Sequence, residues 1–341
     1  MLIAADATYT LDPQPTGIAV YSNRLLDGMM LAHPDSRFLF CYRPHRFWEA
    51  LRQPFRANVW RWPLLEHGPR PGRLFHGLNQ RLPARRWPLQ VATFHDLFVM
   101  THAYSTPEFR ARFTAQARHA AQNADLLIAV SQFTARELQR LVDIDRRRIR
   151  VVPHGVVLPA SLSSVRQNLV LSVGALQKRK NTLRLVRAFA SLPPDWRLVL
   201  AGGRGYGAEE ILAEIGRSPR RAQIEVAGHV SAARLADLYQ HAAIFGFPSL
   251  DEGFGMPILD AMAHGIPVLS SNRSAMPEVC GDAAILVDPE NQEELTHALV
   301  TLASDASLRA SLAARGRERA RQFSWERAVE STWSVYRELL S

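Results

Sequence analysis

Short runs of apolar residues alternate along this chain with segments whose apolar residues recur at helical spacing. Runs of this length are typical of strands buried on both faces, and strands that alternate with helices are typical of parallel α/β sheets. In the first half, strands are predicted at residues 1–6, 37–42, 90–95, 125–131 and 149–154. Helices are predicted between them at residues 18–30 and 107–123.

A second series of the same kind follows residue 160. Strands are predicted at residues 169–174, 197–203, 224–228, 243–249 and 267–271, and helices at residues 181–191, 208–216 and 231–241. The segment 158–167 between the two series is polar and serine-rich, which is typical of a linker between domains. The pattern therefore predicts an α/β protein with two Rossmann-like domains, residues 1–160 and residues 161–324.

The last segment of the chain has one apolar stripe. Trp325, Val329, Trp333, Tyr336 and Leu340 recur three or four positions apart, which predicts an amphipathic helix over about 325–341. Large aromatic residues at this spacing favour packing onto the protein over binding of a ligand.

Composition agrees with two domains, because 341 residues with 47% hydrophobic content can fill more than one core. The first residues lack the long apolar run of a secretory signal, and no stretch approaches the ~18 apolar residues of a spanning helix. These features predict a cytoplasmic protein. Cys41 and Cys280 lie far apart without a C-x-x-C spacing, so we expect two buried thiols rather than a disulfide or a metal site.

The net charge of +9 comes mostly from arginine, which is dense in the first half of the chain. Nucleic acid, an anionic membrane surface or a phosphorylated substrate could each account for such a charge. The sequence contains neither a Cys/His finger nor the aromatic run of an RNA-recognition motif, so no nucleic-acid partner is predicted. A solvated basic face with no specific partner remains an alternative.

The stretch LDEGFGMPILDAMAHGIPVLSS, residues 250–271, carries the clearest candidate chemistry. Pro257 and Gly265 predict a helix over about 257–264, since proline favours the first helical position and glycine the position after the end. Glu252 precedes this helix and Asp260 lies one turn into it. Backbone N–H groups around Phe254, Gly255 and Met256, flanked by two carboxylates, suit a polyhydroxylated or anionic ligand. Complementing the helix dipole is the simpler role for the two acids.

The segment 239–289 that contains this stretch resembles the donor-binding segment of the family 4 glycosyltransferases, retaining enzymes with the GT-B fold. The resemblance extends in the right order to TGIAVYSNRLL, DLLIAVSQFTARELQR, VLSVGALQKRKNTLRLVRAFA, LVLAGGRGYGAEEI and VAGHVSAARLADLY. It implies two Rossmann-like domains that face each other across a cleft. The N-terminal domain would bind the acceptor, the C-terminal domain would bind a nucleotide sugar, and the C-terminal helix would pack back on the N-terminal domain.

The resemblance also implies roles for individual residues. Glu252 matches the first member of the family's E-x7-E motif, which acts at the donor sugar, and Asp260 takes the place of the second glutamate, which holds the ribose. Arg179 and Lys180 match the residues that bind the diphosphate, and Val230 lies in the turn that contacts the base. Ala175 stands where many members have an arginine, and Asp260 is one methylene shorter than the family's glutamate.

In the N-terminal half, Gly17 lies in the first strand-to-helix turn, where a backbone N–H could approach the diphosphate. His95 ends a predicted strand and matches the family's catalytic histidine, which can donate to a sugar hydroxyl or a backbone carbonyl. Two other motifs resemble binding motifs but do not predict a metal site or a dinucleotide site. DID at 143–145 has metal-binding spacing but runs into an arginine cluster, and GGRGYG at 202–207 departs from the dinucleotide pattern.

The resemblance implies a retaining, metal-independent hexosyltransferase without a cofactor. GDP-mannose is the favoured donor and UDP-glucose the next, and the acceptor is a glycan or a lipid-diphosphate-linked glycan. The basic first half suits peripheral contact with an anionic membrane at the inner face of the plasma membrane. A GT-B nucleotide-sugar epimerase and a catalytically decayed nucleotide-binding protein remain alternatives.

Overall fold

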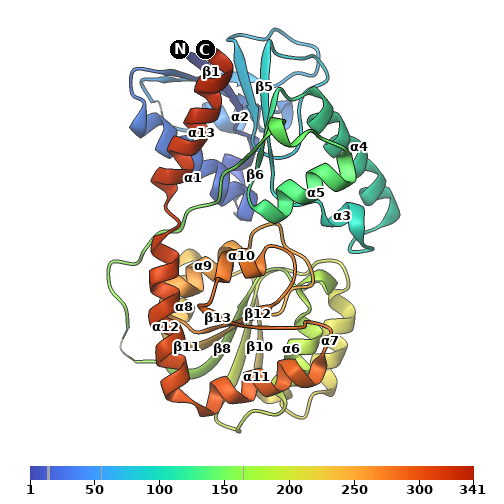
Figure 1. Cartoon of the computed structure of the whole chain (residues 1–341), viewed down its shortest axis with the longest axis vertical. Coiled ribbons are helices and arrows are strands. Elements are labelled where there is room, and N and C mark those ends of the chain that lie inside the picture. Colours follow the sequence, from blue (N-terminus) through green and yellow to red (C-terminus); the bar gives the residue numbers. More distant parts are fainter. Residues whose placement is uncertain (14–15, 55, 164) are drawn as a thin grey trace. The chain divides into compact units, whose positions relative to one another are not determined.

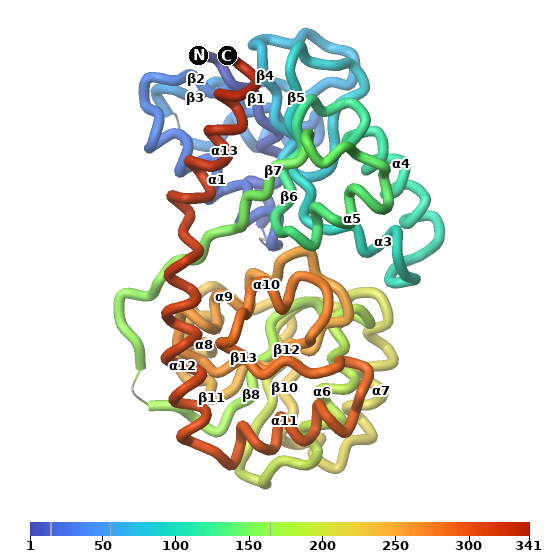
Figure 2. The backbone as a smooth tube through the Cα atoms, in the orientation of Figure 1, coloured from blue at the N-terminus to red at the C-terminus, as the bar shows by residue number. Residues whose placement is uncertain are grey.

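The computed structural model describes residues 1–13, 16–54, 56–163 and 165–341. The chain forms two compact units, one made of Met1–Gly155 with Trp325–Ser341 and the other of Val156–Ser324. We call them unit 1 and unit 2. Figure 2 shows the chain leaving unit 1 once and returning to it for its last helix. The first crossing follows Gly155, whereas the sequence places the domain boundary after residue 160. Residue 164, within the predicted linker, lies outside the described residues.

Among its described residues, unit 1 contains a parallel seven-stranded sheet in the order β3-β2-β1-β4-β5-β6-β7. Its strands are β1 (Leu2–Asp6), β2 (Arg37–Tyr42), β3 (Val59–Pro63), β4 (Leu74–Gly77), β5 (Leu89–Phe94), β6 (Leu126–Ala129) and β7 (Ile149–Val151). Its α-helices are α1 (Gly17–Ala32), α2 (Pro44–Leu51), α3 (Phe98–Thr101), α4 (Pro107–Asn123), α5 (Gln132–Val142) and α13 (Trp325–Leu340).

Helices cover both faces of this sheet (Figure 1). Because successive side chains of a strand point to opposite faces, neighbouring residues of β1 belong to different cores. Ile3 packs in a core with residues of α1 and α13, whereas Ala4 packs in a core with Ala117 of α4 and Leu138 of α5. The near-continuous apolar runs of the sequence are therefore strands buried on both faces.

In unit 2 the described residues form a parallel six-stranded sheet in the order β10-β9-β8-β11-β12-β13. The strands are β8 (Gln167–Val173), β9 (Arg197–Ala201), β10 (Ile224–Gly228), β11 (Ala242–Phe247), β12 (Val268–Ser271) and β13 (Ala284–Val287). The α-helices are α6 (Thr182–Phe189), α7 (Ala208–Arg217), α8 (Ala232–His241), α9 (Met256–Ala263), α10 (Met276–Cys280), α11 (Gln292–Ser304) and α12 (Ala306–Arg321). Both units thus have the Rossmann-like architecture predicted from the sequence.

The C-terminal helix α13 lies beside α1 within unit 1, as predicted (Figure 1). Val329, Trp333 and Tyr336 are buried in the core that α13 shares with α1, so the apolar stripe serves packing. Gly28 of α1 allows this close approach, because a Cβ atom at that position would lie 2.5 Å from Cγ2 of Val329. Trp333 also stacks on His33, with ring centroids 3.6 Å apart.

Several elements were not predicted. Strand β3 is short, lies at the sheet edge and ends in proline, and the four-residue strand β4 contains the buried His76. In unit 2 the missed elements are β13 and the helices α10, α11 and α12. Short or partly polar strands lack a strong periodic signal, and only their neighbours in the sheet make them strands. No helix in the described part of the chain is long and apolar enough to cross a membrane.

Candidate active site

Glu252 is the centre of a buried ionic cluster in unit 2. It follows β11, and its carboxylate contacts two cations that follow β8: Lys180 Nζ lies 2.5 Å from Oε1 and Arg179 Nη1 lies 2.8 Å from Oε2. The three side chains are 8–15% exposed. Since β8 and β11 are neighbours in a parallel sheet, their carboxyl ends bring these residues together.

The two cations control the protonation state of Glu252. Burial by itself raises the pKa of a carboxyl group, but the charges of Arg179 and Lys180 and their hydrogen bonds outweigh it and lower the pKa of Glu252 to about 2. Ser249 adds a hydrogen bond from its hydroxyl to Oε1, 2.8 Å long. The carboxylate is therefore ionised at neutral pH and fixed in one orientation.

Two residues with unusual backbone conformations hold this cluster in place. Asn181, at φ 56°, directs its side-chain amide to the carbonyl oxygens of Pro248 and Pro289. Ser274, at φ 54°, accepts a hydrogen bond from the backbone N–H of Glu252. Left-handed backbone in residues other than glycine is costly and concentrates at functional sites. The sequence reasoning missed both, although an asparagine directly after the basic loop is a signal for such a conformation.

The loops after β8 and β9 pack backbone against backbone beside Lys180. Gly174, at φ 142°, leaves room for the lysine, since a Cβ atom there would lie 3.2 Å from Lys180 Cε. A Cβ atom at Gly202 would lie 2.1 Å from the carbonyl oxygen of Gly174. The GGRGYG stretch therefore serves close packing of loops, in agreement with its departure from the dinucleotide pattern.

Helix α9 starts directly after the cluster. It begins at Met256, one residue earlier than predicted, so that Pro257 is its second residue. Gly255 is the N-cap residue at φ 101°, a conformation that favours glycine. Phe254 is buried and packs edge-on against Phe323, with ring centroids 5.9 Å apart. Phe254, Gly255 and Met256 thus lie at the start of a helix, and their predicted contact with the donor stays a prediction.

Asp260 and Val230 are the remaining residues of unit 2 that the sequence predicts at the donor site. Asp260 is half-buried in α9, and the pKa of Tyr239 in α8 is raised by burial and by the charge of Asp260, so the two side chains are near each other. Val230 follows β10, the edge strand of the sheet. Their predicted roles at ribose and base stay predictions.

His95 in unit 1 lies in a cluster of rings at the carboxyl end of β5. Its Nε2 is 2.8 Å from the carbonyl oxygen of Leu78, and its backbone N–H donates to Gln80. A carbonyl only accepts, so Nε2 carries the proton and the neutral ring offers Nδ1 as an acceptor. Burial lowers the pKa of His95 to about 4, although the hydrogen bond to Leu78 opposes this shift. The imidazole is therefore neutral at neutral pH.

A cavity of about 920 Å³ lies within unit 1. Its lining includes Tyr9, Arg43, Asn79, Gln80, Asp96 and Arg112. Several of these residues follow the carboxyl ends of β1, β2, β4 and β5, and the strand order reverses at β1, which pairs with both β2 and β4. Open α/β sheets bind ligands at such a switch point. Gly17 is exposed at the first position of α1, and its predicted contact with the diphosphate stays a prediction.

Arg43 is held in position at this cavity. Its Nη2 is 3.2 Å from the buried carboxylate of Asp6, and its guanidinium lies over the ring of Tyr9. Asn79 in turn donates to the Tyr9 hydroxyl at 2.9 Å. These contacts tie together segments that follow β1, β2 and β4, and they give the cavity a preformed polar wall.

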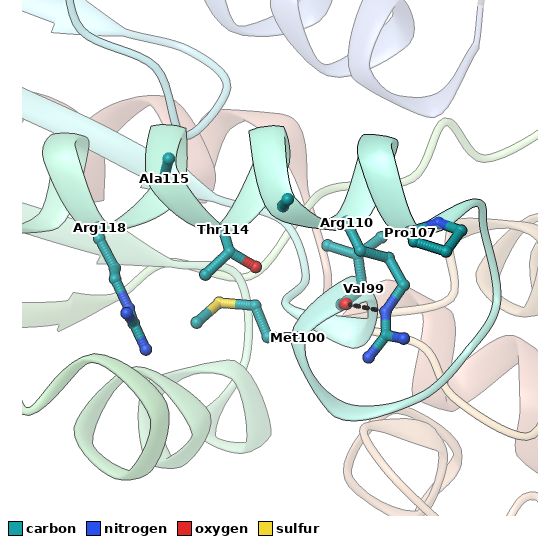
Figure 3. Close-up of a pocket in the computed structure, with 8 residues that line it drawn as sticks. Val99, Met100, Pro107, Arg110, Thr114, Ala115 and Arg118 are labelled. Carbon is teal, nitrogen blue, oxygen red and sulfur yellow. Dashed lines mark hydrogen bonds between the residues drawn. The ribbon is translucent and has the colours of Figure 1, made fainter.

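A shallower groove of about 430 Å³ lies on α4 and α3. Its lining residues are Val99, Met100, Pro107, Arg110, Ala111, Thr114, Ala115 and Arg118, and Figure 3 shows the Thr114 and Arg118 side chains extending from α4 toward Met100. Arg110 Nε donates to the carbonyl of Val99 at 3.0 Å. The eight lining residues include two cations and no acid, so the groove is apolar and positively charged.

Comparison with known proteins identifies the chain. The model of Glycosyltransferase Family 4 matches residues 30–158, and the model of Glycosyl transferases group 1 matches residues 159–319. O-antigen chain mannosyltransferase B of Escherichia coli is 33% identical over 282 residues, 77% of this chain and 74% of that protein. The chain belongs to glycosyltransferase family 4. It is an enzyme of this class, as the sequence motifs predict.

Solved structures show the GT-B fold of this glycosyltransferase. Sucrose-phosphate synthase from Thermosynechococcus elongatus covers 100% of this chain and 99% of its own, with a TM-score of 0.80 and 20% identity. The Anabaena protein HepE in complex with UDP-glucose covers 99% of each chain, with a TM-score of 0.75 and 17% identity. At these identities the likeness shows the fold.

The remaining motifs have structural roles in the glycosyltransferase. Asp143 ends α5 in a left-handed conformation. Asp145 caps the following turn and pairs with Arg147, so the two acids of the DID motif have local structural roles. No cluster of three potential metal ligands occurs among the residues that the structure describes. Cys41 and Cys280 are buried free thiols, as predicted, and burial raises the pKa of each.

Proposed function

We propose that this glycosyltransferase moves mannose from GDP-mannose to a glycan or to a lipid-diphosphate-linked glycan. The anomeric configuration is retained and no metal is required. In this reaction the bond between the anomeric carbon and the phosphate oxygen breaks, and its electron pair goes to the diphosphate. A bond forms to an acceptor hydroxyl oxygen, whose proton goes to the departing diphosphate.

The contact between Lys180 and Glu252 is the observation that carries this proposal. The Lys180 ammonium has three N–H donors, and one is directed at Glu252 Oε1 at 2.5 Å. Negative charge develops on the phosphate oxygens as the sugar departs, and an ammonium group beside them would stabilise it. Arg179 is more deeply buried, and its Nη1 donates to the Asp251 carbonyl and contacts Glu252. We therefore assign the main diphosphate contact to Lys180, and to Arg179 the orientation of the carboxylate.

The identity of the sugar rests on the relatives. The Escherichia coli protein that matches over three quarters of the chain is a mannosyltransferase, which supports a mannosyl donor. The Anabaena structure with UDP-glucose has the same fold, which keeps UDP-glucose as the alternative donor. For the acceptor we propose the 920 Å³ cavity of unit 1, whose polar wall around Arg43 suits a hydroxylated or anionic glycan.

Replacing Lys180 by methionine tests the assignment of the diphosphate site. Lys178, which is exposed in the same short turn, gives the matched control Lys178→Met. We expect transfer to fall by about 10²- to 10³-fold in the first variant and to stay near normal in the second. Near-normal transfer by both variants would remove the proposed site.

A thermal-shift panel of GDP, UDP and their sugars identifies the donor, because a ligand that binds only the folded state raises the melting temperature. Product analysis without acceptor completes this test. A changed nucleotide sugar would identify an epimerase, and binding without hydrolysis or transfer would identify a decayed nucleotide-binding protein.

A lipid-linked acceptor requires contact with a membrane, and we propose the groove between α3 and α4 for this contact. Arg110 and Arg118 lie eight positions apart on one face of α4, about 12 Å along the helix axis. Residues with small side chains fill the face between them, and Met100 lies below (Figure 3). Cations beside apolar side chains match anionic lipid headgroups. Val99 lines both the groove and the larger cavity, which places the membrane contact next to the proposed acceptor site.

Vesicle binding tests this contact. The double variant Arg110→Gln, Arg118→Gln should lose about 1 kcal/mol per arginine of affinity for vesicles that contain phosphatidylglycerol. Neutral phosphatidylcholine vesicles should bind weakly in every case, and salt should weaken binding to anionic ones. Arg221→Gln, Arg315→Gln, which removes two exposed arginines of unit 2, is the charge-matched control. Equal loss in both double variants would contradict a specific contact.

A further inference from the structure

His154 lies against the proposed catalytic histidine, although sequence reasoning assigned it no role. It follows β7, and its ring faces that of His95 with centroids 5.3 Å apart and planes 23° apart. It is 3% exposed. We infer that His154 is a positioning residue that shields one face of His95 and keeps its imidazole neutral and fixed for transfer, an inference that rests on the proposed function.

Two further rings pack around His95 and His154. Tyr21 of α1 meets His95 edge-on with centroids 4.7 Å apart, and it also contacts His154 at 4.9 Å. Trp325, the first residue of α13, lies on His154 at 6.1 Å and on Tyr21 at 6.4 Å. His95 is thus held by rings from two other segments, while the hydrogen bonds to Leu78 and Gln80 set its rotation.

The hydroxyl network beneath these rings is buried as well. Tyr21 bonds to Thr93 at 3.0 Å, and Thr93 bonds to His76 Nε2 at 2.8 Å. His76 Nδ1 lies 2.6 Å from the hydroxyl of Tyr336 in α13. This chain of hydrogen bonds fixes Tyr21, and Tyr21 fixes the edge of His95 and the ring of His154.

His154 lies at the point where the chain crosses between the units. The chain leaves unit 1 directly after Gly155 and re-enters it at Trp325. Both connecting segments are therefore anchored in the ring cluster that holds His95. Because His154 directly precedes the crossing, its packing on His95 attaches the connecting segment to the ring cluster.

The titratable groups around His95 come from every element packed on it. They are Tyr21 of α1, His76 of β4, His154 after β7, and Asp96, which follows His95 in the chain. Burial lowers the pKa of His154 well below its usual value, and the charge of a protonated His95 lowers it further. Two neighbouring buried imidazoles cannot both be charged at low cost, so the neutral pair is the stable state at neutral pH.

A neutral His95 suits the proposed reaction. The donor sugar carries positive charge in the transition state, and an imidazolium beside it would repel that charge. The neutral ring offers Nδ1 to a sugar hydroxyl, since Nε2–H is directed to Leu78. Removal of His154 would admit water to the face of His95 and would let its pKa rise toward the ordinary value.

Replacement of His154 by alanine and by phenylalanine tests this inference. His154→Ala should raise the pKa of His95 from about 4 toward its usual value near 6.5. Transfer at pH 5.5 should then be about tenfold lower than at pH 7.5, a drop that the parent enzyme does not show. His154→Phe keeps a ring on His95 and should keep the parent profile. A pH profile that is unchanged in His154→Ala would overturn the inference.

An NMR titration of the His95 imidazole separates this inference from the proposed function. The titration should move in His154→Ala even if the protein transfers no mannose, and a fixed titration would overturn the positioning role while leaving the function intact. If His154→Ala does not fold, Trp325→Leu removes the ring behind His154 and should shift the titration in the same direction by less. No shift in that variant would also count against the ring cluster.

Discussion

Units 1 and 2 share one architecture, but the ends of their strands carry opposite chemistry. In unit 2, Glu252 is ionised and held between Arg179 and Lys180 at 2.8 and 2.5 Å. In unit 1, His95 is neutral and held between rings, with His154 at 5.3 Å. A buried charge is stable only when opposite charges and hydrogen bonds surround it, whereas a buried imidazole becomes neutral instead.

This difference separates what each unit contributes to the proposed reaction. In that reaction the fixed charges of unit 2 would stabilise the negative charge of the departing diphosphate, whereas unit 1 would contribute a neutral histidine held among uncharged rings. The same difference makes each site sensitive to a different change. Removal of one charged side chain should destabilise the ionic cluster of unit 2 most. A fall in pH should destabilise the ring cluster of unit 1 first.

The largest effect is expected from Glu252→Gln. This change leaves Arg179 and Lys180 without their buried counter-charge, which should lower the free energy of unfolding by about 3–5 kcal/mol. Transfer should fall at least about 10²-fold, because the carboxylate also orients Lys180. Urea unfolding followed by circular dichroism and donor turnover measure the two effects.

Glu290→Gln is the matched control within unit 2. Glu290 pairs with Arg273 at 2.6 Å, but the two side chains are 56% and 41% exposed. An exposed pair contributes less than about 1 kcal/mol. Similar losses of stability in the two variants would show that burial does not distinguish the Glu252 cluster.

Acid should destabilise unit 1 at higher pH than unit 2. Burial lowers the folded-state pKa of His76 to about 3 and that of His95 to about 4, so the unfolded chain binds protons first. The stability from these neutral histidines is complete above about pH 6.5 and declines as pH falls toward 4. The pKa of Glu252 is lowered to about 2, so its stabilising contribution persists above about pH 4.5 and is lost between there and pH 2.

Tryptophan fluorescence can follow the two units separately. Trp196 is the only tryptophan of the sequence between residues 156 and 324, and it is 3% exposed. In Trp196→Phe the signal comes from unit 1, and its denaturation midpoint should decline between pH 6.5 and 4. An equal decline of the Trp196 fluorescence, taken as the difference between the parent and this variant, would contradict the comparison.

The smallest effect is expected from Gly28→Ala in unit 1. The added methyl group would lie 2.5 Å from Val329 Cγ2 and should push α13 from α1. Overpacking lowers the free energy of unfolding by about 1–3 kcal/mol, and the better helix propensity of alanine offsets up to about 1 kcal/mol of this loss. A lower thermal midpoint should result, and Val329→Ala in the same protein should restore part of it. No recovery would argue against this contact.

Much of the fold was predictable from the sequence because buried parallel strands are apolar without interruption. The runs at 37–42 and 125–131 correspond to β2 and β6, and the stripe from Trp325 corresponds to α13. Strand β4 was not predictable, since four residues with a buried histidine have no periodicity. It becomes a strand because β1 and β5 pair with it on both sides.

The candidate site was predictable where a motif holds its chemistry in neighbouring residues. Glu252 and Lys180 were predicted, but their direct contact was not, because 72 positions separate them in the chain. Asn181, Ser249 and Ser274 were missed, since a polar residue in a loop has no signal until its partner is known. Phe254, Gly255 and Met256 were placed correctly at the start of a helix, one residue from the observed boundary.

The sequence by itself determined that the chain folds as two parallel α/β units and belongs to the glycosyltransferases, because apolar runs and motifs are local properties of the chain. Only the tertiary structure decided the electrostatic state of the site. It placed two cations within 3 Å of Glu252 and packed His154 on His95, residues that lie far apart in sequence. Burial and neighbouring charge set a pKa, and both depend on which distant segments meet.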